Sequence, residues 1–369
     1  MLSRVLGLVI KEFLALLRDK TSRFVLIGPP LLQLLVFGYA ATYDLNHIPY
    51  AVFNQDSGFA SREFLGRLQG SPDFQQVATI THESQIAPLI NNKKALLVVN
   101  IGPHFTRDLL LYHPAKVQVI VDGRNSNTAT LALNDFNSIV LGFDTHWALH
   151  HEWGHPAAQL VVRAWFNPNL LSRWFIIPGI VALLMLVVTL LVTGLSVARE
   201  REQGTFDQLL VTPLTPLEIL IGKALPGFII GALEGVFIIL VAVFWFQVPL
   251  IGNLLALALG MILFLFAAIG IGLMISSLAF TQQQGLLGVF LFLVPAIILS
   301  GFATPIANMP KLVQDLTFLN PMRYFLIIVR GTFLEGDSFT NLWPQYWPLA
   351  LIAIFSMTAA GWLFRHRLQ

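Results

Sequence analysis

The sequence predicts an α-helical polytopic membrane protein with six transmembrane helices, a cytoplasmic amphipathic N-terminal helix, and a mixed α/β extracytoplasmic domain between the first and second spans. Composition is the first observation: of 369 residues, 56% are hydrophobic and only 11% are charged, whereas a soluble globular protein carries about 25% charged residues. The second observation is that residues 174–198, 235–310 and 338–364 contain no charged side chain. Because roughly 20 apolar residues cross the hydrocarbon core as a helix, these stretches predict membrane spans.

Turn-like residues divide the longest apolar stretch, first at Gln247, Pro249 and Gly252 and then at residues 281–284. The six expected spans are residues 24–43, 174–198, 217–246, 254–279, 285–303 and 344–364. Short flanks rich in Lys and Arg favour the cytoplasm. Such flanks precede the first span, follow the second and follow the sixth. With six spans these flanks share one face, so we expect both chain termini in the cytoplasm.

The segments outside the spans have their own patterns. Residues 1–23 place apolar side chains at helical spacing with Arg4, Lys11 and Arg18 on the other face, which predicts an interfacial elbow helix. A signal peptide cleaved after residue 41 is the alternative, and the patterned residues before the apolar stretch argue against it. We expect residues 44–173 to form the extracytoplasmic domain and residues 174–369 to form a five-helix transmembrane region. In that domain, β-prone runs at 50–53, 77–80, 95–101 and 117–121 alternate with helical patterns at 60–68, 84–91 and 128–150.

Several function classes are disfavoured by what the sequence lacks. It contains no cysteine, which excludes disulfides, thiolate metal sites and cysteine nucleophiles. A net charge of +2 does not favour nucleic-acid binding. No G-x-x-x-x-G-K-[ST] phosphate-binding loop is present, since Lys223 is followed by Ala224 and has no matching upstream glycine. We therefore expect no cofactor on this chain and no ATP hydrolysis by it.

One motif points to a different activity. His151, Glu152 and His155 match H-E-x-x-H, in which two histidines one helical turn apart hold zinc. Gly154 weakens the helix, Pro156 follows the second histidine, and no acidic residue follows until Glu200. A membrane-anchored zinc peptidase is therefore the weaker alternative, and we expect no metal.

Glu234 is the only ionisable residue deep inside a predicted span. A buried carboxylate is costly in a membrane and faces protein or a cavity. A proton-coupled carrier would use it, but such a carrier needs several intramembrane acids. A hydrogen-bonded structural role is the other explanation, and a receptor or assembly scaffold without transport also remains open.

Residues 199–216 form the loop between the second and third spans. Residues 199–202 continue a helix past the membrane, Gly204 can end it, and Thr215, Pro216 and Glu218 form a capping box for the third span. The turn 206–211 is apolar, and we expect it to face the cytoplasm. Either it is an ordinary connector, or it docks a cytoplasmic protein.

Residues 304–336 hold two short helical patterns separated by prolines. One pattern starts near Pro310 and ends before Pro321, and the other runs to Gly331. We expect a re-entrant hairpin against the outer leaflet, since exposed irregular backbone is not tolerated there. A plain surface loop is the alternative. The expected hairpin residues are Pro305, Pro310, Pro321 and Arg330.

Taken in order, these segments resemble the membrane subunits of type-2 ABC exporters, the ABC-2 permease family, in its bacterial multidrug-export branch. The matching residues near the front are Lys11-Glu12, Arg18-Asp19-Lys20 and Phe37-Gly38. The most specific match is residues 198–205 with Thr212-Pro213, Glu218 and Gly222-Lys223. The last match comprises Ser300-Gly301-Phe302, Pro305, Met309-Pro310, Asn320-Pro321, Tyr324-Phe325 and Arg330-Gly331.

The resemblance implies a mechanism and its partners. Two six-span subunits, either two copies or a copy and a sister permease, pair in the lipid of a bacterial inner membrane. Each docks on a separate ATPase, which holds ATP and Mg²⁺, through the elbow helix and the 199–216 loop. The implied coupling residues are Arg199, Glu200, Arg201, Glu202, Gly204, Thr205, Phe206 and Leu210. The external domain and the hairpin would guard the exit and meet a periplasmic adaptor, and the cargo would be apolar or amphipathic.

Overall fold

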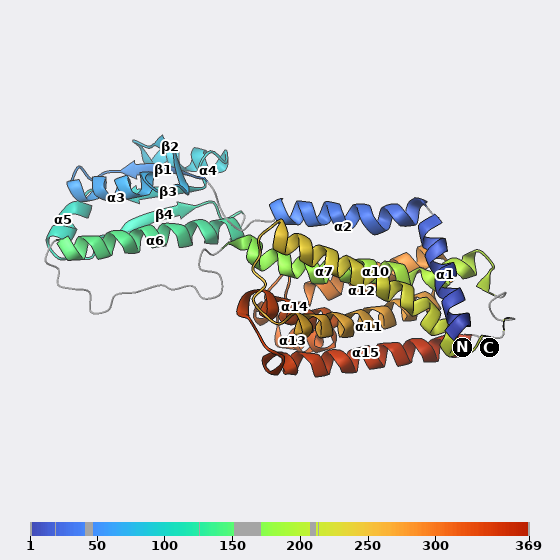
Figure 1. Cartoon of the computed structure of the whole chain (residues 1–369). Helices are drawn as coiled ribbons and strands as arrows, with labels where there is room; N and C mark the ends of the chain where they lie inside the picture. Colours follow the sequence, from blue (N-terminus) through green and yellow to red (C-terminus); the bar gives the residue numbers. More distant parts are fainter. Residues whose placement is uncertain are drawn as a thin grey trace. The chain divides into compact units, whose positions relative to one another are not determined.

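The computed structural model describes residues 2–18, 20–40, 47–124, 126–150, 171–206, 212 and 214–367. It has two compact units, one formed by Met1–Ala41 with Trp165–Gln369 and the other by Thr42–Ala164. The first unit is a helical bundle (Figure 1). Its helices are α1 (Leu2–Arg18), α2 (Lys20–Ala40), α7 (Ser172–Gly194), α8 (Ser196–Glu202), α10 (Pro216–Phe244), α11 (Leu254–Leu278), α12 (Gln282–Ile298), α13 (Lys311–Leu316), α14 (Pro321–Arg330) and α15 (Phe339–Arg367).

Within the described residues, four helices are long and apolar enough to cross a membrane. They are Ser172–Glu202, Pro216–Phe244, Leu254–Leu278 and Phe339–His366, while Ile27–Tyr39 and Gln282–Ile298 are apolar but shorter. This confirms a polytopic helical membrane chain. The six-span count and the extracytoplasmic placement of residues 44–173 stay predictions.

Local sequence signals explain where several helices begin and end. The predicted capping box is present: Glu218 N donates to Thr215 Oγ1 at 3.3 Å, and Thr215 N donates to Glu218 Oε2 at 2.8 Å. Two orphan donors at the start of α10 are thereby satisfied. Gly204 ends the α8 turn with a φ of +69°, a left-handed conformation that glycine adopts without a Cβ clash.

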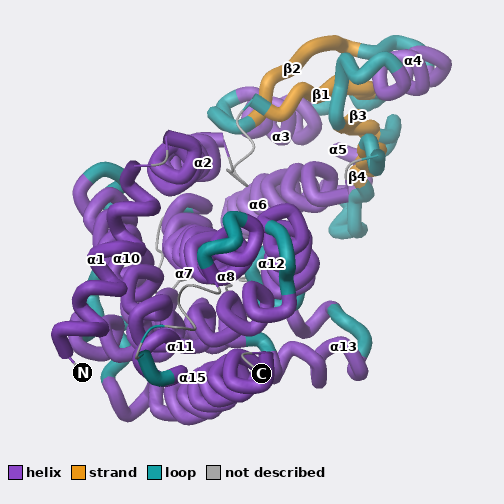
Figure 2. The backbone as a smooth tube through the Cα atoms, turned by 90° about the vertical axis from the view of Figure 1, so that its right-hand side faces the viewer, coloured by secondary structure: helices purple, strands orange, loops and turns teal. Residues whose placement is uncertain are grey.

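Helix α7 lies in the middle of the bundle, with α10, α11 and α12 around it (Figure 2). Small residues let neighbouring backbones approach closely, as is common between membrane helices. A Cβ added at Gly270 of α11 would lie 2.7 Å from the Met357 backbone nitrogen of α15. The rings of Phe264 and Phe325 stack with centroids 4.3 Å apart, which joins α11 to α14.

The segment between α12 and α15 contains the two predicted short helices. A 3₁₀ turn (Ile306–Asn308), α13 and a second 3₁₀ turn (Thr317–Leu319) come first, and then α14 continues into a π-helical turn (Gly331–Glu335). Helix α14 is part of the bundle core, with Met322, Phe325 and Ile328 fully buried. A plain surface loop is therefore wrong for residues 321–330. Pro321 stands at its first turn, and Asn320 caps it by accepting from Met322 N at 3.0 Å.

The second unit contains a four-stranded sheet. Strands β1 (Ile48–Asn54), β2 (Phe74–Thr79), β3 (Leu97–Ile101) and β4 (Val117–Val121) occur in the order β2-β1-β3-β4, with only the β3–β4 pair antiparallel. Strand β2 begins three residues before the predicted run, and the others contain or lie within theirs. Helices α3 (Phe59–Gln69), α5 (Phe105–Leu110) and α6 (Ser126–His150) pack on one face, and α4 (Ile86–Asn91) packs on the other.

Candidate functional site

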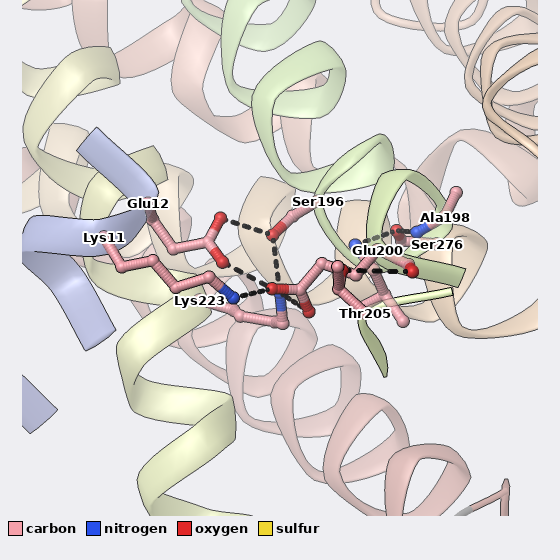
Figure 3. A network of polar contacts seen from close by, with 9 residues as sticks. Lys11, Glu12, Ser196, Ala198, Glu200, Thr205, Lys223 and Ser276 are labelled. Atoms are coloured by element: carbon pink, nitrogen blue, oxygen red, sulfur yellow. Dashed lines mark hydrogen bonds and ion pairs between the residues drawn. The ribbon is translucent and has the colours of Figure 1, made fainter. Parts of the chain in front are cut away.

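Four charged side chains meet at the end of the bundle where α1 crosses the long helices (Figures 1 and 3). Lys11 and Glu12 come from α1, Glu200 from α8 and Lys223 from α10. We call these four residues the ion-pair cluster. Two cations face two anions, so the cluster has no net charge.

Lys223 is at the centre of this cluster, with its side chain only 1% exposed. Its Nζ lies 3.0 Å from Glu12 Oε1 and 2.7 Å from Glu200 Oε2. Lys11 Nζ lies 2.5 Å from Glu200 Oε1. Ser196 completes the network by donating to Glu12 Oε2 at 3.3 Å and accepting from Lys223 at 3.4 Å. The elbow helix is thus joined through charges to both α8 and α10.

Burying such charges carries a desolvation cost, which is offset only when every charge is paired. The opposite charges in the cluster are matched, and removing one would leave the buried groups that remain with an unbalanced charge. A cavity of about 120 Å³ borders the cluster and is also lined by Arg199, Gln203 and Thr205. The ion pairs of Glu200 with Lys11 and Lys223 join helix α8 to α1 and α10.

The far end of α8 contacts the turn between α11 and α12. Arg201 Nη1 donates to the carbonyl oxygens of Ser277 at 2.8 Å and Ala279 at 3.2 Å, at the C-terminus of α11. Glu202 Oε2 accepts from Gln282 N at 2.6 Å, at the N-terminus of α12. Each charge complements the helix end it meets. The start of α8 is tied to α11 as well, since Val197 N and Ala198 N donate to Ser276 Oγ at 2.9 and 3.1 Å.

The expectation that the turn after α8 is exposed is wrong for its first residue. Phe206 is buried, and its ring meets that of Phe364 in α15 edge-on with centroids 6.1 Å apart. The Arg201 guanidinium lies 5.0 Å from the Phe206 ring centroid. An aromatic side chain beside a long apolar helix gains more from burial than from a cytoplasmic position. Leu210 and the rest of 207–211 lie outside the described residues.

The other predicted coupling residues differ in accessibility. Glu200 is buried in the ion-pair cluster, whereas Glu202 and Gly204 are exposed. Thr205 is half-buried, and its backbone N–H donates to Glu200 O at 3.0 Å. Arg199 and Arg201 are also half-buried. The described coupling residues therefore lie together around α8, but only some of their side chains are exposed to a partner.

Glu234 lies in α10, about eleven residues beyond Lys223, which is roughly 16 Å along a helix. Both of its carboxylate oxygens are buried, and no described residue forms a hydrogen bond or ion pair with them. The hydrogen-bonded structural partner expected from the sequence is thus absent from the described part of the chain.

The remaining candidates lie elsewhere. Pro305 and Pro310 are exposed, Pro321 is buried, and the Arg330 guanidinium carbon stands 3.8 Å from the Phe175 ring centroid. His151 and His155 lie outside the described residues. Within the described ranges no group of three or more metal-ligating side chains gathers.

Sequence reasoning missed that Lys11, Glu12, Ser196 and Lys223 belong to the site. A local signal existed for Glu12, since it lies four residues from both Leu8 and Leu16 on the buried face of the amphipathic helix. A lysine among apolar residues early in a span likewise requires a buried partner. No local signal existed for Ser196.

Comparisons with known proteins agree with this architecture. The family model for the ABC-2 family transporter protein matches residues 20–362. The chain is 39% identical to the probable multidrug ABC transporter permease YbhR of Escherichia coli strain K12, over all of both chains. It is 34% identical to the probable multidrug ABC transporter permease YbhS of the same strain over 90% of this chain and 89% of YbhS. It is 30% identical to the inner membrane transport permease YhhJ of that strain over 99% of this chain and 97% of YhhJ. The chain therefore belongs to the ABC-2 family, as the membrane-spanning permease subunit of an exporter.

Proposed function

We propose that this permease docks a separate ABC ATPase at residues 199–216 and moves an apolar or amphipathic molecule, such as a drug or lipid-like compound, out of the cytoplasm or the inner membrane. The position of α8 supports this docking site most directly. Its polar groups bond to α1, α10, α11 and the start of α12 at once. A force applied to the loop after α8 would therefore reach four helices of the bundle together.

The drug-like cargo rests on two further facts. The relatives YbhR and YbhS are named as probable multidrug ABC transporter permeases. The spans themselves carry almost no charge, with Glu234 as the exception deep in α10. A strongly hydrophilic solute would find few polar partners along such helices.

The assembly we propose contains two permeases, either two copies of this chain or one copy with a sister chain, with one ATPase under each. Both termini lie in the cytoplasm, the chain crosses a bacterial inner membrane six times, and residues 44–173 lie outside. The described N-terminal and C-terminal helix ends lie at the same end of the bundle, as this topology requires (Figure 1). The external domain and the 304–336 hairpin would then flank the exit and contact a periplasmic adaptor.

The absence of cysteine from the sequence makes the topology directly testable. Gln203 and Gln69 are both exposed, one just after α8 and the other at the end of α3. We expect a membrane-impermeant thiol reagent to label Gln69→Cys in intact cells and Gln203→Cys only after the inner membrane is opened. Labelling of Gln203→Cys from outside would contradict the proposed docking face.

Transport itself is tested in vesicles that contain the permease with or without its ATPase. We expect ATP-dependent movement of a fluorescent amphiphile only when both are present. We expect Gln203→Cys to form a cross-link to the ATPase and Gln69→Cys to form none, because we propose that the ATPase docks beside α8. Vigorous movement by the permease alone, or movement of hydrophilic cargo only, would contradict the proposal.

A further inference from the structure

The side of the bundle carries an apolar groove. It lies between α1, α2 and α10 and has a volume of about 560 Å³. Among the residues that the structure describes, its lining is apolar except for Arg23 and Glu234. Drug-sized ligands occupy cavities of about 300–1,000 Å³, mostly apolar, with a few polar groups that fix orientation.

The lips of this groove consist of exposed apolar side chains. Leu17 is 56% exposed, Ile27 61% and Leu233 65%. Exposing such an apolar rim to water would be unfavourable, whereas lipid tails are as apolar as the rim itself. An occupant would therefore enter sideways from the bilayer.

The carboxyl group of Glu234 selects the occupant of the groove. Both Glu234 oxygens are buried, and within the described ranges no side chain or backbone group bonds to them. Lys223 of the ion-pair cluster lies roughly 16 Å away along α10 and is already matched by Glu12 and Glu200. Arg23 also lines the groove, but its guanidinium does not bond to either Glu234 oxygen. A cation bound there would pair with the ionised form of this carboxyl group, in a medium where such pairing is strongly favoured.

We infer that the groove between α1, α2 and α10 is a binding site for an amphipathic organic cation, whose apolar body fills the groove and whose charge pairs with Glu234. This inference rests on the proposed export function, because it names the substrate class that the permease would accept from the membrane. The groove lining contains none of the four residues of the ion-pair cluster.

The test uses the full-length permease in nanodiscs of zwitterionic lipid, without ATPase or ATP. The probes are methyltriphenylphosphonium, a permanent cation, and triphenylphosphine oxide, a neutral molecule of nearly the same shape. We expect wild type to bind the cation at least tenfold more tightly than the neutral probe, and E234Q to lose this preference. Because E234Q keeps the shape of the side chain and is uncharged, we expect it to remain folded.

A second pair of variants tests the groove without touching the carboxylate. Leu31 lines the groove, whereas Leu35, one turn further along α2, does not. We expect Leu31→Trp to weaken binding of both probes at least fivefold and Leu35→Trp to change it less than twofold. Equal cation binding by wild type and E234Q, which a lipid tail or an uncharged ligand in the groove would give, overturns the inference. So does unchanged binding in Leu31→Trp.

Transport with the ATPase present separates this inference from the proposed function. If the wild-type complex exports the cation and E234Q exports it equally well, the site is wrong while the exporter proposal holds. If wild type binds the cation through Glu234 but the complex moves no amphiphile with ATP, the exporter proposal fails and the binding site holds.

Discussion

Lys223 provides the sharpest test of the ion-pair cluster. Its ammonium group is buried between Glu12 and Glu200, at 3.0 and 2.7 Å. Lys223→Met keeps a similar length of side chain and removes the charge. Two buried carboxylates then share a single, half-exposed cation, Lys11. Breaking a buried pair in this way costs about 3–5 kcal/mol in the free energy of unfolding.

Glu12→Gln is the matched partner in a double-mutant cycle. Alone it leaves Lys223 paired with Glu200, so we expect a loss of about 1–3 kcal/mol from the remaining charge imbalance. Combined with Lys223→Met, it restores neutrality, because Lys11 and Glu200 then match each other. The double variant should therefore be less destabilised than the sum of the two single changes, with a coupling energy of about 1–3 kcal/mol.

The free energies are measured by unfolding the full-length permease in mixed micelles with increasing denaturing detergent, followed by circular dichroism. The reasoning is refuted if Lys223→Met costs less than about 1 kcal/mol, or if the two single effects simply add. ATP-driven transport by the same variants checks the mechanical role. We expect Lys223→Met to lose most transport and the charge-balanced double variant to regain part of it.

Three further changes have distinct expected outcomes. Gly270→Val should force α11 away from the Met357 backbone, now 2.7 Å from the position of an added Cβ, and lower the unfolding free energy by about 1–3 kcal/mol; no loss would show that the contact yields. Gly204→Ala should lower the unfolding free energy by about 1–2 kcal/mol, because alanine is strained at the left-handed φ of +69°. No steric clash adds to this cost, since an added Cβ meets nothing within 4 Å. Gly204→Asn should lower the unfolding free energy less, and equal losses for the two variants would argue against backbone strain. Hydrogen bonds from Arg124 lower the pKa of Asp122 to about 2, so this pair should stabilise the turn after β4 above about pH 4 and lose the effect as the pH falls through about 2. Hydrogen exchange around β4 should therefore be faster in Asp122→Asn than in wild type at about pH 5, and a difference that persisted unchanged at low pH would contradict this assignment.

The local features of this protein were predictable because they depend on residues close together in the chain. Charge-free stretches identified the long apolar helices, since helix rise and membrane thickness set their length. Thr215 and Glu218 are three residues apart and predicted their own capping box, and Gly204 predicted the end of α8. The strands of the second unit followed from short β-prone runs in the same way.

The sequence by itself determined that this is a polytopic membrane chain with a defined set of local helix signals. Only the tertiary structure decided which distant groups meet: Glu12 with Lys223, Phe206 with Phe364, and Glu202 with the first turn of α12. Periodicity tells which face of a helix is apolar, but it does not tell which neighbour covers that face. The same reason applies to Glu234, whose place in a span was evident from the residues around it. Its burial in a groove, with no partner among the described residues, depends on how α1 and α2 pack beside α10.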